Sequence, residues 1–280
     1  MPDTTRGTVR PFRALEELEA YLRAAGFVAI AFSGGLDSRF LVHTALRAGV
    51  DVLALHAAGP HIPRREQAYA EKWAEQRGVA LHSFAFDPLL VPALANNPKD
   101  RCYHCKKTLF TTIREHVGTR PLLDGTTASD MGEYRPGIRA LNELGVQSPL
   151  AAVGLTKNTI RLLAAATDMD NAEQTPQPCL LTRFAYGMRL NAAWLSAMDA
   201  GEEAISHILG SLGFDPVPGF RLRAITPERT ELHIAGAELA PEKALAIAKA
   251  LETKGFSPIP VKGVATLSGF FDRPETETPT

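Results

Sequence analysis

The alternation of apolar and polar segments predicts a parallel α/β fold in the first part of the chain. Short apolar runs of strand length stand at 27–32, 51–58 and 80–87, and the first two are each followed by a stretch with helical spacing that ends at a glycine. A short amphipathic helix is predicted at 16–25 and a fourth strand at 121–125. This order is typical of a doubly wound parallel sheet with right-handed crossovers.

Loops and shorter elements complete this first part. Three prolines break residues 88–100, which predicts a loop that leads into a helix beginning at 101. The polar stretch 126–141 is expected to form a loop over the carboxyl edge of the sheet. A short strand is predicted at 148–150 and a helix at 155–169, before an extended loop.

The pattern changes after about residue 190. A helix to about 212, strands at 220–225 and 230–236, a helix at 240–255 and a strand at 258–267 are the elements predicted there. That alternation is typical of a small α+β domain. We therefore predict two domains, 1–188 and 189–280.

Composition narrows the class of protein. Hydrophobic residues make up 45% of the 280 residues, which is enough to build cores, and no apolar run reaches membrane-spanning length. Because the first segment lacks the apolar core of a signal peptide, we expect a cytoplasmic protein without a membrane partner. Thirty Lys and Arg against 31 Asp and Glu give a formal net charge of −1, which favours a small acceptor over a nucleic acid such as tRNA.

The segment SGGLDS, residues 33–38, lies where a predicted strand meets a predicted helix. Gly34 and Gly35 allow a tight turn, and the N–H groups with the helix dipole favour an anion. Ser33 and Ser38 can donate hydrogen bonds, whereas Asp37 is compatible with phosphate only through a cation such as Mg²⁺. The segment lacks the lysine of the Walker loop and the spacing of the dinucleotide motif.

This segment resembles the PP-loop of the ATP pyrophosphatases, a Rossmann-like family that adenylates a carbonyl oxygen and releases pyrophosphate. The resemblance implies binding of ATP with Mg²⁺. The alternative is an ordinary glycine turn capped by Asp or Ser.

Cys102, Cys105 and Cys179 are the three cysteines of the chain. A redox disulfide within RCYHCKK, a zinc site completed by His104 or His82, and a single nucleophilic or sulfur-donating Cys179 are three interpretations. A fourth is a 4Fe-4S cluster held by all three thiolates, with one iron open to bind sulfide. Small buried hydrophobes are the remaining alternative.

Several segments in order resemble the LarE family of PP-loop sulfur transferases, which build the nickel-pincer nucleotide cofactor. They are AFSGGLDS, HIPRRE, NPKDRCYHCKK, DGTTASD, YRPGIRAL, ELGVQSPL, GLTKNTIR and CLLTRFAYG, and they span about 27–190. The resemblance implies that ATP adenylates a carboxylate of a pyridinium mononucleotide and that sulfur then displaces AMP. It also implies a homo-oligomer.

Members of that family are of two kinds. In one kind a single cysteine, matched here by Cys179, gives up its sulfur, whereas the other has two more cysteines and a cluster that relays sulfide from a sulfide or cysteine-derived source. The additional pair places this chain with the second kind. The resemblance implies ATP and Mg²⁺ binding by Ser33, Gly34, Gly35, Asp37 and Ser38, catalysis by Asp37 and Cys179, and cluster ligation by Cys102, Cys105 and Cys179. It also implies acceptor binding by Arg135, Arg139 and Arg183. His61, Arg64 and Arg65 are weaker candidates near the nucleotide.

The second domain departs from the family pattern. LarE proteins follow the cysteine loop with an acidic helix and an Arg-x-Arg-His-His-Gly strand, and RLRAITPERTEL lacks the His-His-Gly. Glu202 or Glu203, of which we prefer Glu203, is expected to act with Arg221 and Arg223 in acceptor binding. A tRNA thiolase, an amidating PP-loop synthetase and a non-catalytic sensor remain as alternatives.

Overall fold

The computed structural model describes residues 5–132, 135–236 and 240–272. Two compact units are present: a first unit formed by the chain up to Val91 together with Asp100–Gln177, and a second formed by Pro92–Lys99 together with the chain from Pro178 onward. Each unit has its own sheet, so the two are described separately.

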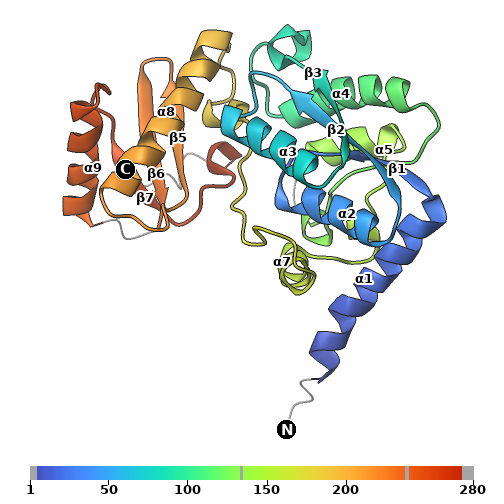
Figure 1. Ribbon diagram of the computed structural model, residues 1–280. Coiled ribbons are helices and arrows are strands. Elements are labelled where there is room, and N and C mark those ends of the chain that lie inside the picture. Colours follow the sequence, from blue (N-terminus) through green and yellow to red (C-terminus); the bar gives the residue numbers. More distant parts are fainter. Residues whose placement is uncertain (1–4, 133–134, 237–239, 273–280) are drawn as a thin grey trace. The chain divides into compact units, whose positions relative to one another are not determined.

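A parallel sheet of four strands forms the centre of the first unit (Figure 1). The strands are β1 (Phe27–Ala31), β2 (Asp51–Ala58), β3 (Ala80–Ala85) and β4 (Leu122–Leu123), in the order β3-β2-β1-β4. All neighbouring pairs are parallel. The predicted doubly wound α/β fold is confirmed.

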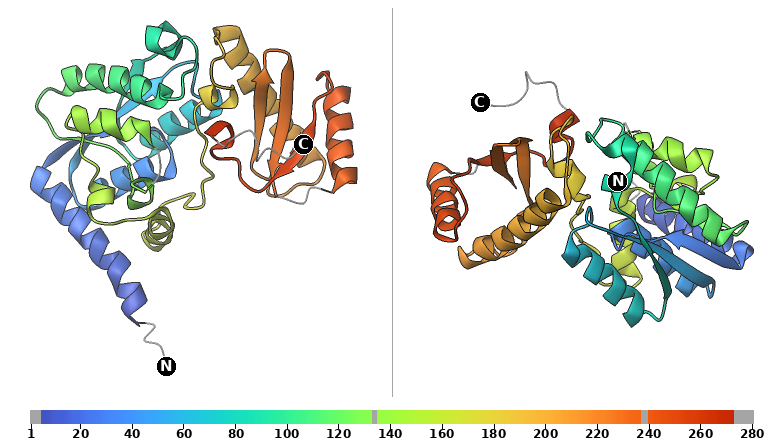
Figure 2. Two further views of the ribbon diagram at one scale, coloured as in Figure 1. Left: turned by 180° about the vertical axis from the view of Figure 1, so that it is seen from behind. Right: turned by 90° about the horizontal axis from the view of Figure 1, so that it is seen from above.

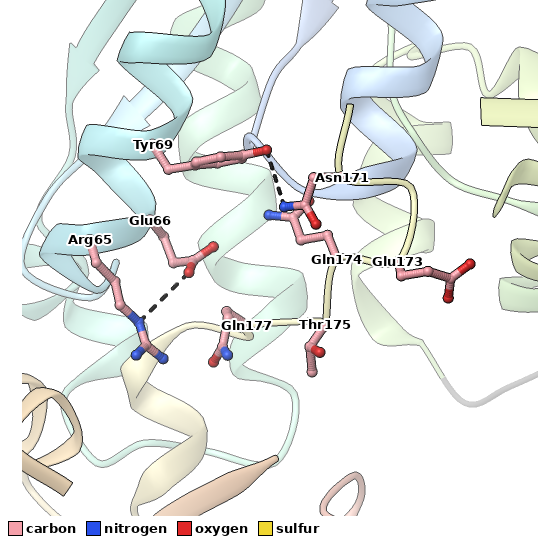
Figure 3. A pocket seen from close by; sticks show the side chains of 8 residues that line it. All are labelled: Arg65, Glu66, Tyr69, Asn171, Glu173, Gln174, Thr175 and Gln177. Atoms are coloured by element: carbon pink, nitrogen blue, oxygen red, sulfur yellow. Dashed lines mark hydrogen bonds and ion pairs between the residues drawn. The ribbon is translucent and has the colours of Figure 1, made fainter. Parts of the chain in front are cut away.

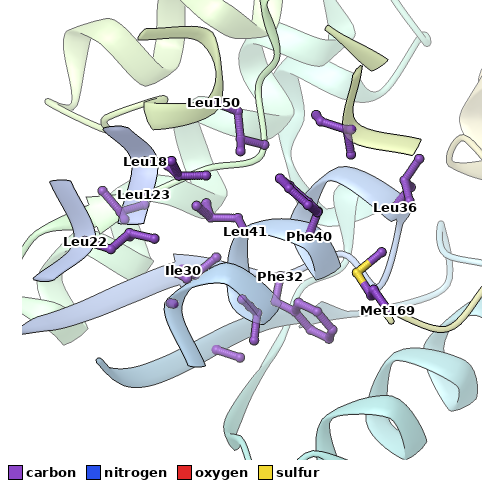
Figure 4. Close-up of a cluster of buried hydrophobic side chains, with 14 of the residues drawn as sticks. Leu18, Leu22, Ile30, Phe32, Leu36, Phe40, Leu41, Leu123, Leu150 and Met169 are labelled. Carbon is purple, nitrogen blue, oxygen red and sulfur yellow. The ribbon is translucent and has the colours of Figure 1, made fainter. Parts of the chain in front are cut away.

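Helices cover both faces of this sheet (Figure 2). On one side are α1 (Thr5–Ala25), α2 (Leu36–Arg47), α3 (Arg64–Gln76), α6 (Pro149–Ala152) and α7 (Lys157–Ala166). On the other side are α4 (Arg101–Val117) and α5 (Pro136–Glu143). Successive residues of β1 enter different cores: Val28 joins the first cluster, as does Ile30 (Figure 4), whereas Ala29 joins the second. This is the period of two expected of a strand buried on both faces.

The second unit is a small α+β arrangement. Its elements are α8 (Ala192–Ser211), β5 (Phe220–Thr226), β6 (Arg229–Ala235), α9 (Pro241–Thr253) and β7 (Val261–Val264). The sheet order is β5-β6-β7, with β5 and β6 antiparallel and β6 and β7 parallel. A Cβ placed on Gly201 of α8 would lie 2.9 Å from Leu222 Cδ1, so α8 packs closely on one face of this sheet.

Three local predictions differ from the structure. Residues 148–150 form the start of α6 instead of a strand, because Pro149 sits at the first helical position, which it favours. α5 begins inside the predicted loop 126–141 for the same reason, with Pro136 at its first position. The first helix begins at Thr5, well before residue 16, and accommodates Pro11.

Short 3₁₀ helices complete the chain: η1 (Pro88–Leu90), η2 (Pro92–Leu94), η3 (Ala128–Asp130), η4 (Leu180–Arg183) and η5 (Phe270–Asp272). Among the helices of the described residues, none combines the length and the hydropathy needed to cross a membrane.

Candidate functional site

The SGGLDS segment forms the turn between β1 and α2. Gly34 has φ +76°, and a Cβ there would lie only 2.6 Å from the Cβ of Ala70 on α3. A side chain would therefore be strained by the backbone and would also collide with the neighbouring helix. The turn can approach α3 this closely only because residue 34 is glycine.

Two serine hydroxyls close this turn. Ser38 Oγ donates to the carbonyl of Gly35 at 3.0 Å and lies 3.2 Å from Ser33 Oγ. The N–H of Gly35 donates to Ser33 Oγ at 3.3 Å. Gly35 is the N-cap of α2 and has no side chain to cap the helix, so the N–H groups at the positive end of this 12-residue helix face the turn, and Asp37 is the acidic residue of its first turn.

The loop after β4 reaches the same place. A Cβ on Gly125 would lie 3.0 Å from the N of Ser38 and 3.2 Å from the C of Asp37. The loops after β1 and β4 therefore meet where the strand order changes direction, since β2 lies on one side of β1 and β4 on the other. Ligands of open parallel sheets bind at such switch points.

Asp37 lies in the first turn of α2, where its backbone adjoins Gly125, and one of its carboxylate oxygens is unsatisfied. Its Oδ1 is buried and accepts no hydrogen bond from any residue that the structure describes. Burial raises the pKa of the Asp37 carboxyl from 3.8 to about 6, with Lys157 acting in the opposite direction and Asp130 adding to the rise. A buried carboxylate oxygen in this state is suited to a cation.

Asp130 anchors the positive charges beside Asp37. Its Oδ1 accepts from Lys157 Nζ at 2.8 Å and lies 2.9 Å from Arg135 Nη2, while its Oδ2 accepts from the N–H and hydroxyl of Thr127 at 2.9 Å each. Burial alone would raise the pKa of Asp130, but the hydrogen bonds from Lys157 and Thr127, with Arg135, hold it below its usual value. Asp130 is therefore a carboxylate that stays ionised and holds Lys157 and Arg135 in place.

Arg135 and Arg139 have different surroundings although they are four residues apart. Arg135 joins the Asp130 cluster. Arg139 lies with its guanidinium 3.7 Å from the centroid of the Tyr103 ring and 3.6 Å from Glu143, and it is 62% exposed. The structure thus brings Arg135, but not Arg139, to the carboxylates beside the SGGLDS turn.

Cys102 and Cys105 occupy the start of α4, directly after the N-cap Asp100. Cys102 is exposed and Cys105 is half-buried. A separation of three residues places both on one face of the helix. Glu143 accepts from Lys107 Nζ at 2.9 Å and from Tyr103 Oη at 3.0 Å, so α5 holds this end of α4 in place.

Cys179 lies in the second unit, as the N-cap residue of η4, and is half-buried. Thr182 Oγ1 donates to the Cys179 carbonyl at 2.8 Å. Arg183 is 0% exposed and donates to both carboxylate oxygens of Glu202 at 2.9 Å, and to the carbonyl of Pro178 at 3.0 Å. The Cys179 loop is thereby fixed to α8 through a buried bidentate ion pair.

Arg221 and Arg223 are buried on the sheet of the second unit. In the register of the antiparallel strands β5 and β6, Arg221 stands opposite His233 and Arg223 stands opposite Glu231. Arg223 Nη1 donates to the carbonyl of Thr182 at 2.8 Å, which connects this face to the Cys179 loop. Glu203, in contrast to Glu202, is exposed on α8.

Comparisons with known proteins were made for the whole chain. No protein-family model matches it. A pyridinium-3,5-bisthiocarboxylic acid mononucleotide synthase of Lactiplantibacillus plantarum is 31% identical over 205 residues, which cover 71% of this chain and 73% of the relative. Uncharacterized proteins of Synechocystis and Methanocaldococcus jannaschii are 30% identical over 82% of this chain and 29% identical over 66% of it, and they are matched over 82% and 72% of their own lengths.

The chain belongs to the LarE family. The resemblance drawn from AFSGGLDS, RCYHCKK and the other segments is confirmed.

Two positively charged side chains beside Asp37 were not among the predicted site residues of this LarE-family chain. Lys157 at the start of α7 binds Asp130, and Arg161, one turn further along the same helix, also lowers the pKa of Asp37. Both stand in GLTKNTIR, which carried part of the resemblance. Their spacing of four residues puts them on one helix face, which was the only signal available from the sequence.

In the ranges that the structure covers, no three side chains of His, Cys, Asp and Glu are grouped so as to hold a metal ion. The three cysteines are present as thiols, without a disulfide.

Proposed function

We propose that this LarE-family protein is an ATP-dependent sulfur transferase. It would adenylate a carboxylate of a small nucleotide-like acceptor, release pyrophosphate, and replace AMP with sulfur. The observation that carries the proposal is Asp37, a carboxylate with a buried, unsatisfied oxygen in the first turn of α2, directly after the glycine turn that follows β1. A triphosphate with its Mg²⁺ ion supplies the cation that this oxygen lacks.

The residues around Asp37 fit ATP as a substrate. The turn of Ser33, Gly34, Gly35 and Ser38 offers amide and hydroxyl groups for the phosphates, and Lys157 and Arg135 lie beside Asp130. An acceptor carboxylate oxygen forms a bond to the α-phosphorus while the bond to the β-phosphate oxygen breaks. The positive groups would stabilise the negative charge that develops on the departing pyrophosphate.

Sulfur transfer completes the reaction. A sulfide nucleophile forms a bond to the acyl carbon, the carbon–oxygen bond breaks, and AMP leaves with the former carboxylate oxygen. The mixed anhydride makes AMP a good leaving group, which is the reason that ATP is needed. The product is a thiocarboxylate, the group named in the product of the L. plantarum relative. By that relationship we place the reaction in nickel-pincer cofactor synthesis.

Three thiolates suit an iron-sulfur cluster, and we propose Cys102, Cys105 and Cys179 as its ligands. A 4Fe-4S cluster with three protein ligands has one iron open, at which sulfide can be held when the cluster is bound. Within this chain, Thr182 and Arg183 would hold the loop that carries Cys179. Without a cluster, Cys179 itself would be the sulfur donor.

For the acceptor, we propose that arginines recognise its phosphate and carboxylates. The candidates are Arg135 and Arg139 of the first unit, and Arg221, Arg223 and Glu203 of the second. Arg183 is a candidate as well, but the contacts described above make it primarily a positioning residue for the Cys179 loop.

Anaerobic turnover tests the proposal. The protein is incubated with Mg-ATP, sulfide and pyridinium-3,5-dicarboxylic acid mononucleotide, and pyrophosphate, AMP and the mass of the acceptor are followed. We expect equal amounts of pyrophosphate and AMP, together with an acceptor in which sulfur replaces oxygen. Asp37→Asn is the inactive control. An unchanged acceptor and no pyrophosphate in the wild type would refute the proposal.

A further inference from the structure

A cavity of about 410 Å³ lies in the first unit between the first turns of α3 and the extended segment 171–177 (Figure 3). Tyr69 borders it on one side, and Thr175 and Gln177 border it on the other (Figure 3). The remaining lining side chains are polar or charged, and none is aliphatic. A volume of this size accommodates a small organic ligand, and such a lining selects one that forms hydrogen bonds.

The wall formed by the segment after α7 is rigidly held. Arg39 of α2 is fully buried and donates to the carbonyls of Asp170 and Asn171 at 2.8 and 2.9 Å. It also donates twice to Gln174 Oε1, at 2.9 and 3.2 Å. This wall is therefore preformed, because one buried guanidinium holds the lining residues Asn171 and Gln174 together with the adjacent Asp170.

The same wall is tied to the SGGLDS turn. Gln174 Nε2 donates to the carbonyl of Gly34 at 3.3 Å, and Gly34 is packed against Ala70 of α3. The residue before Ala70 is Tyr69, which lines the cavity. The cavity therefore opens directly beside the turn to which the proposed function assigns the phosphates of ATP.

Tyr69 is the one aromatic ring of the lining. The Arg39 guanidinium lies 5.4 Å from its centroid. Arg39 is buried and is not among the residues that line the cavity. Asn171 Nδ2 donates to Tyr69 Oη at 3.3 Å and fixes the ring. The half-buried Tyr69 ring lines the cavity, and an aromatic ring of this kind can stack on a planar ligand.

One hydrogen-bond acceptor of the cavity lining, on Gln177, is unsatisfied. Gln177 Oε1 is buried and has no hydrogen-bond partner among the residues described. It would accept from an N–H or O–H of a ligand, which would remove the cost of an unsatisfied buried acceptor. Arg65 adds a cation at the rim, 3.7 Å from the neighbouring Glu66.

We propose that this cavity binds the planar heterocyclic ring of a nucleotide, stacked on Tyr69 and hydrogen-bonded to Gln177. Two molecules of the proposed reaction carry such a ring, namely the adenine of ATP and the pyridine ring of the acceptor. The inference rests on the proposed function, which supplies both molecules. The shared chemistry is a flat ring with polar substituents, next to phosphate bound at the SGGLDS turn.

Calorimetric titration tests the site without requiring turnover. Mg-ATP and nicotinic acid mononucleotide, a pyridine carboxylate nucleotide, are titrated separately into the wild type and into Tyr69→Leu and Gln177→Leu. Lys72→Leu is the matched control, because Lys72 is exposed on the same helix and does not line the cavity. Loss of an aromatic stacking partner is expected to weaken binding roughly tenfold.

Each outcome decides a different question. Weaker ATP binding in Tyr69→Leu identifies the ring as adenine, and weaker mononucleotide binding with unchanged ATP binding identifies it as the acceptor ring. Unchanged affinity for both ligands in Tyr69→Leu and Gln177→Leu would overturn the inference. If the wild type released no pyrophosphate and yet bound a nucleotide in a Tyr69-dependent way, the proposed function would fail while the binding site would stand.

Discussion

Replacing Asp37 by asparagine is expected to stabilise the protein in the absence of nucleotide and to remove its ATP-dependent activity. The carboxyl has a pKa of about 6 in the folded chain because it is buried, and its Oδ1 accepts no hydrogen bond from the described residues. The carboxylate present at neutral pH is therefore less stable in the folded chain than in the unfolded chain. Lys157 and Arg161 offset only part of this cost.

The expected gain in the free energy of unfolding follows from the pKa shift of Asp37. Each pKa unit corresponds to about 1.36 kcal/mol, so the rise from 3.8 to about 6 costs roughly 3 kcal/mol above pH 6. The amide of asparagine needs partners of its own, which removes about 1 kcal/mol of the gain. We expect the variant to be about 1–3 kcal/mol more stable at pH 7.5. Because the folded pKa is raised, the cost is present above that pKa and disappears as the pH falls below the unfolded pKa.

Urea unfolding at pH 7.5, 6.0 and 4.5 measures this difference. At pH 4.5 the Asp37 carboxyl of the folded wild type is mostly protonated. The stability gained by removing its negative charge should therefore fall to about one third of the gain at pH 7.5. Asp51→Asn is the matched control, because Asp51 is exposed and its replacement removes the same charge. Mg-ATP should raise the unfolding midpoint of the wild type but not that of Asp37→Asn. A variant that is less stable at pH 7.5, or a difference independent of pH, would refute the reasoning.

Three further changes test other parts of the site. Gly34→Ala should destabilise the protein by about 1–3 kcal/mol more than Gly49→Ala, because both residues have φ above +60° and only the first would meet a neighbouring side chain; equal urea midpoints would contradict this. Cys102→Ala and Cys179→Ala should each lose the iron and acid-labile sulfide of anaerobically purified protein, and full iron in either variant would remove that residue from the ligand set. Arg183→Ala should cost about 3–5 kcal/mol of stability, since it leaves a buried glutamate uncompensated, and an unchanged urea midpoint would show that the ion pair does not hold the loop.

The fold of the first unit was largely predictable because its signals are local. Apolar runs bounded by glycines predict β1, β2 and β3, and a strand buried on both faces is nearly continuous in apolar residues. The errors fall where local signals mislead. Pro136 is predicted within a loop and Pro149 within a short strand, whereas each starts a short helix.

The site was predictable only where its residues are neighbours in sequence. Ser33 to Ser38 act as one turn, so the sequence alone places them together. Lys157 reaches Asp130 across 27 residues, and Gln174 reaches Gly34 across 140. Such contacts depend on how α7 and the segment after it pack against α2, which no short motif encodes. The cationic cluster and the cavity beside the turn therefore emerge only from the structure.

The second unit shows how a sheet can supply a side chain that one strand lacks. The strand of Arg221 and Arg223 has no following histidine pair, which set this chain apart from the family pattern. In the structure, β6 places His233 directly opposite Arg221, and β7 places Lys262 beside His233. The face therefore carries two arginines, an imidazole and an amine, with Glu231 accepting from His233 at 2.8 Å and from Lys262 at 3.2 Å. Because opposite residues of neighbouring strands share a face, a difference in the motif of one strand does not establish a difference in the chemistry of the sheet.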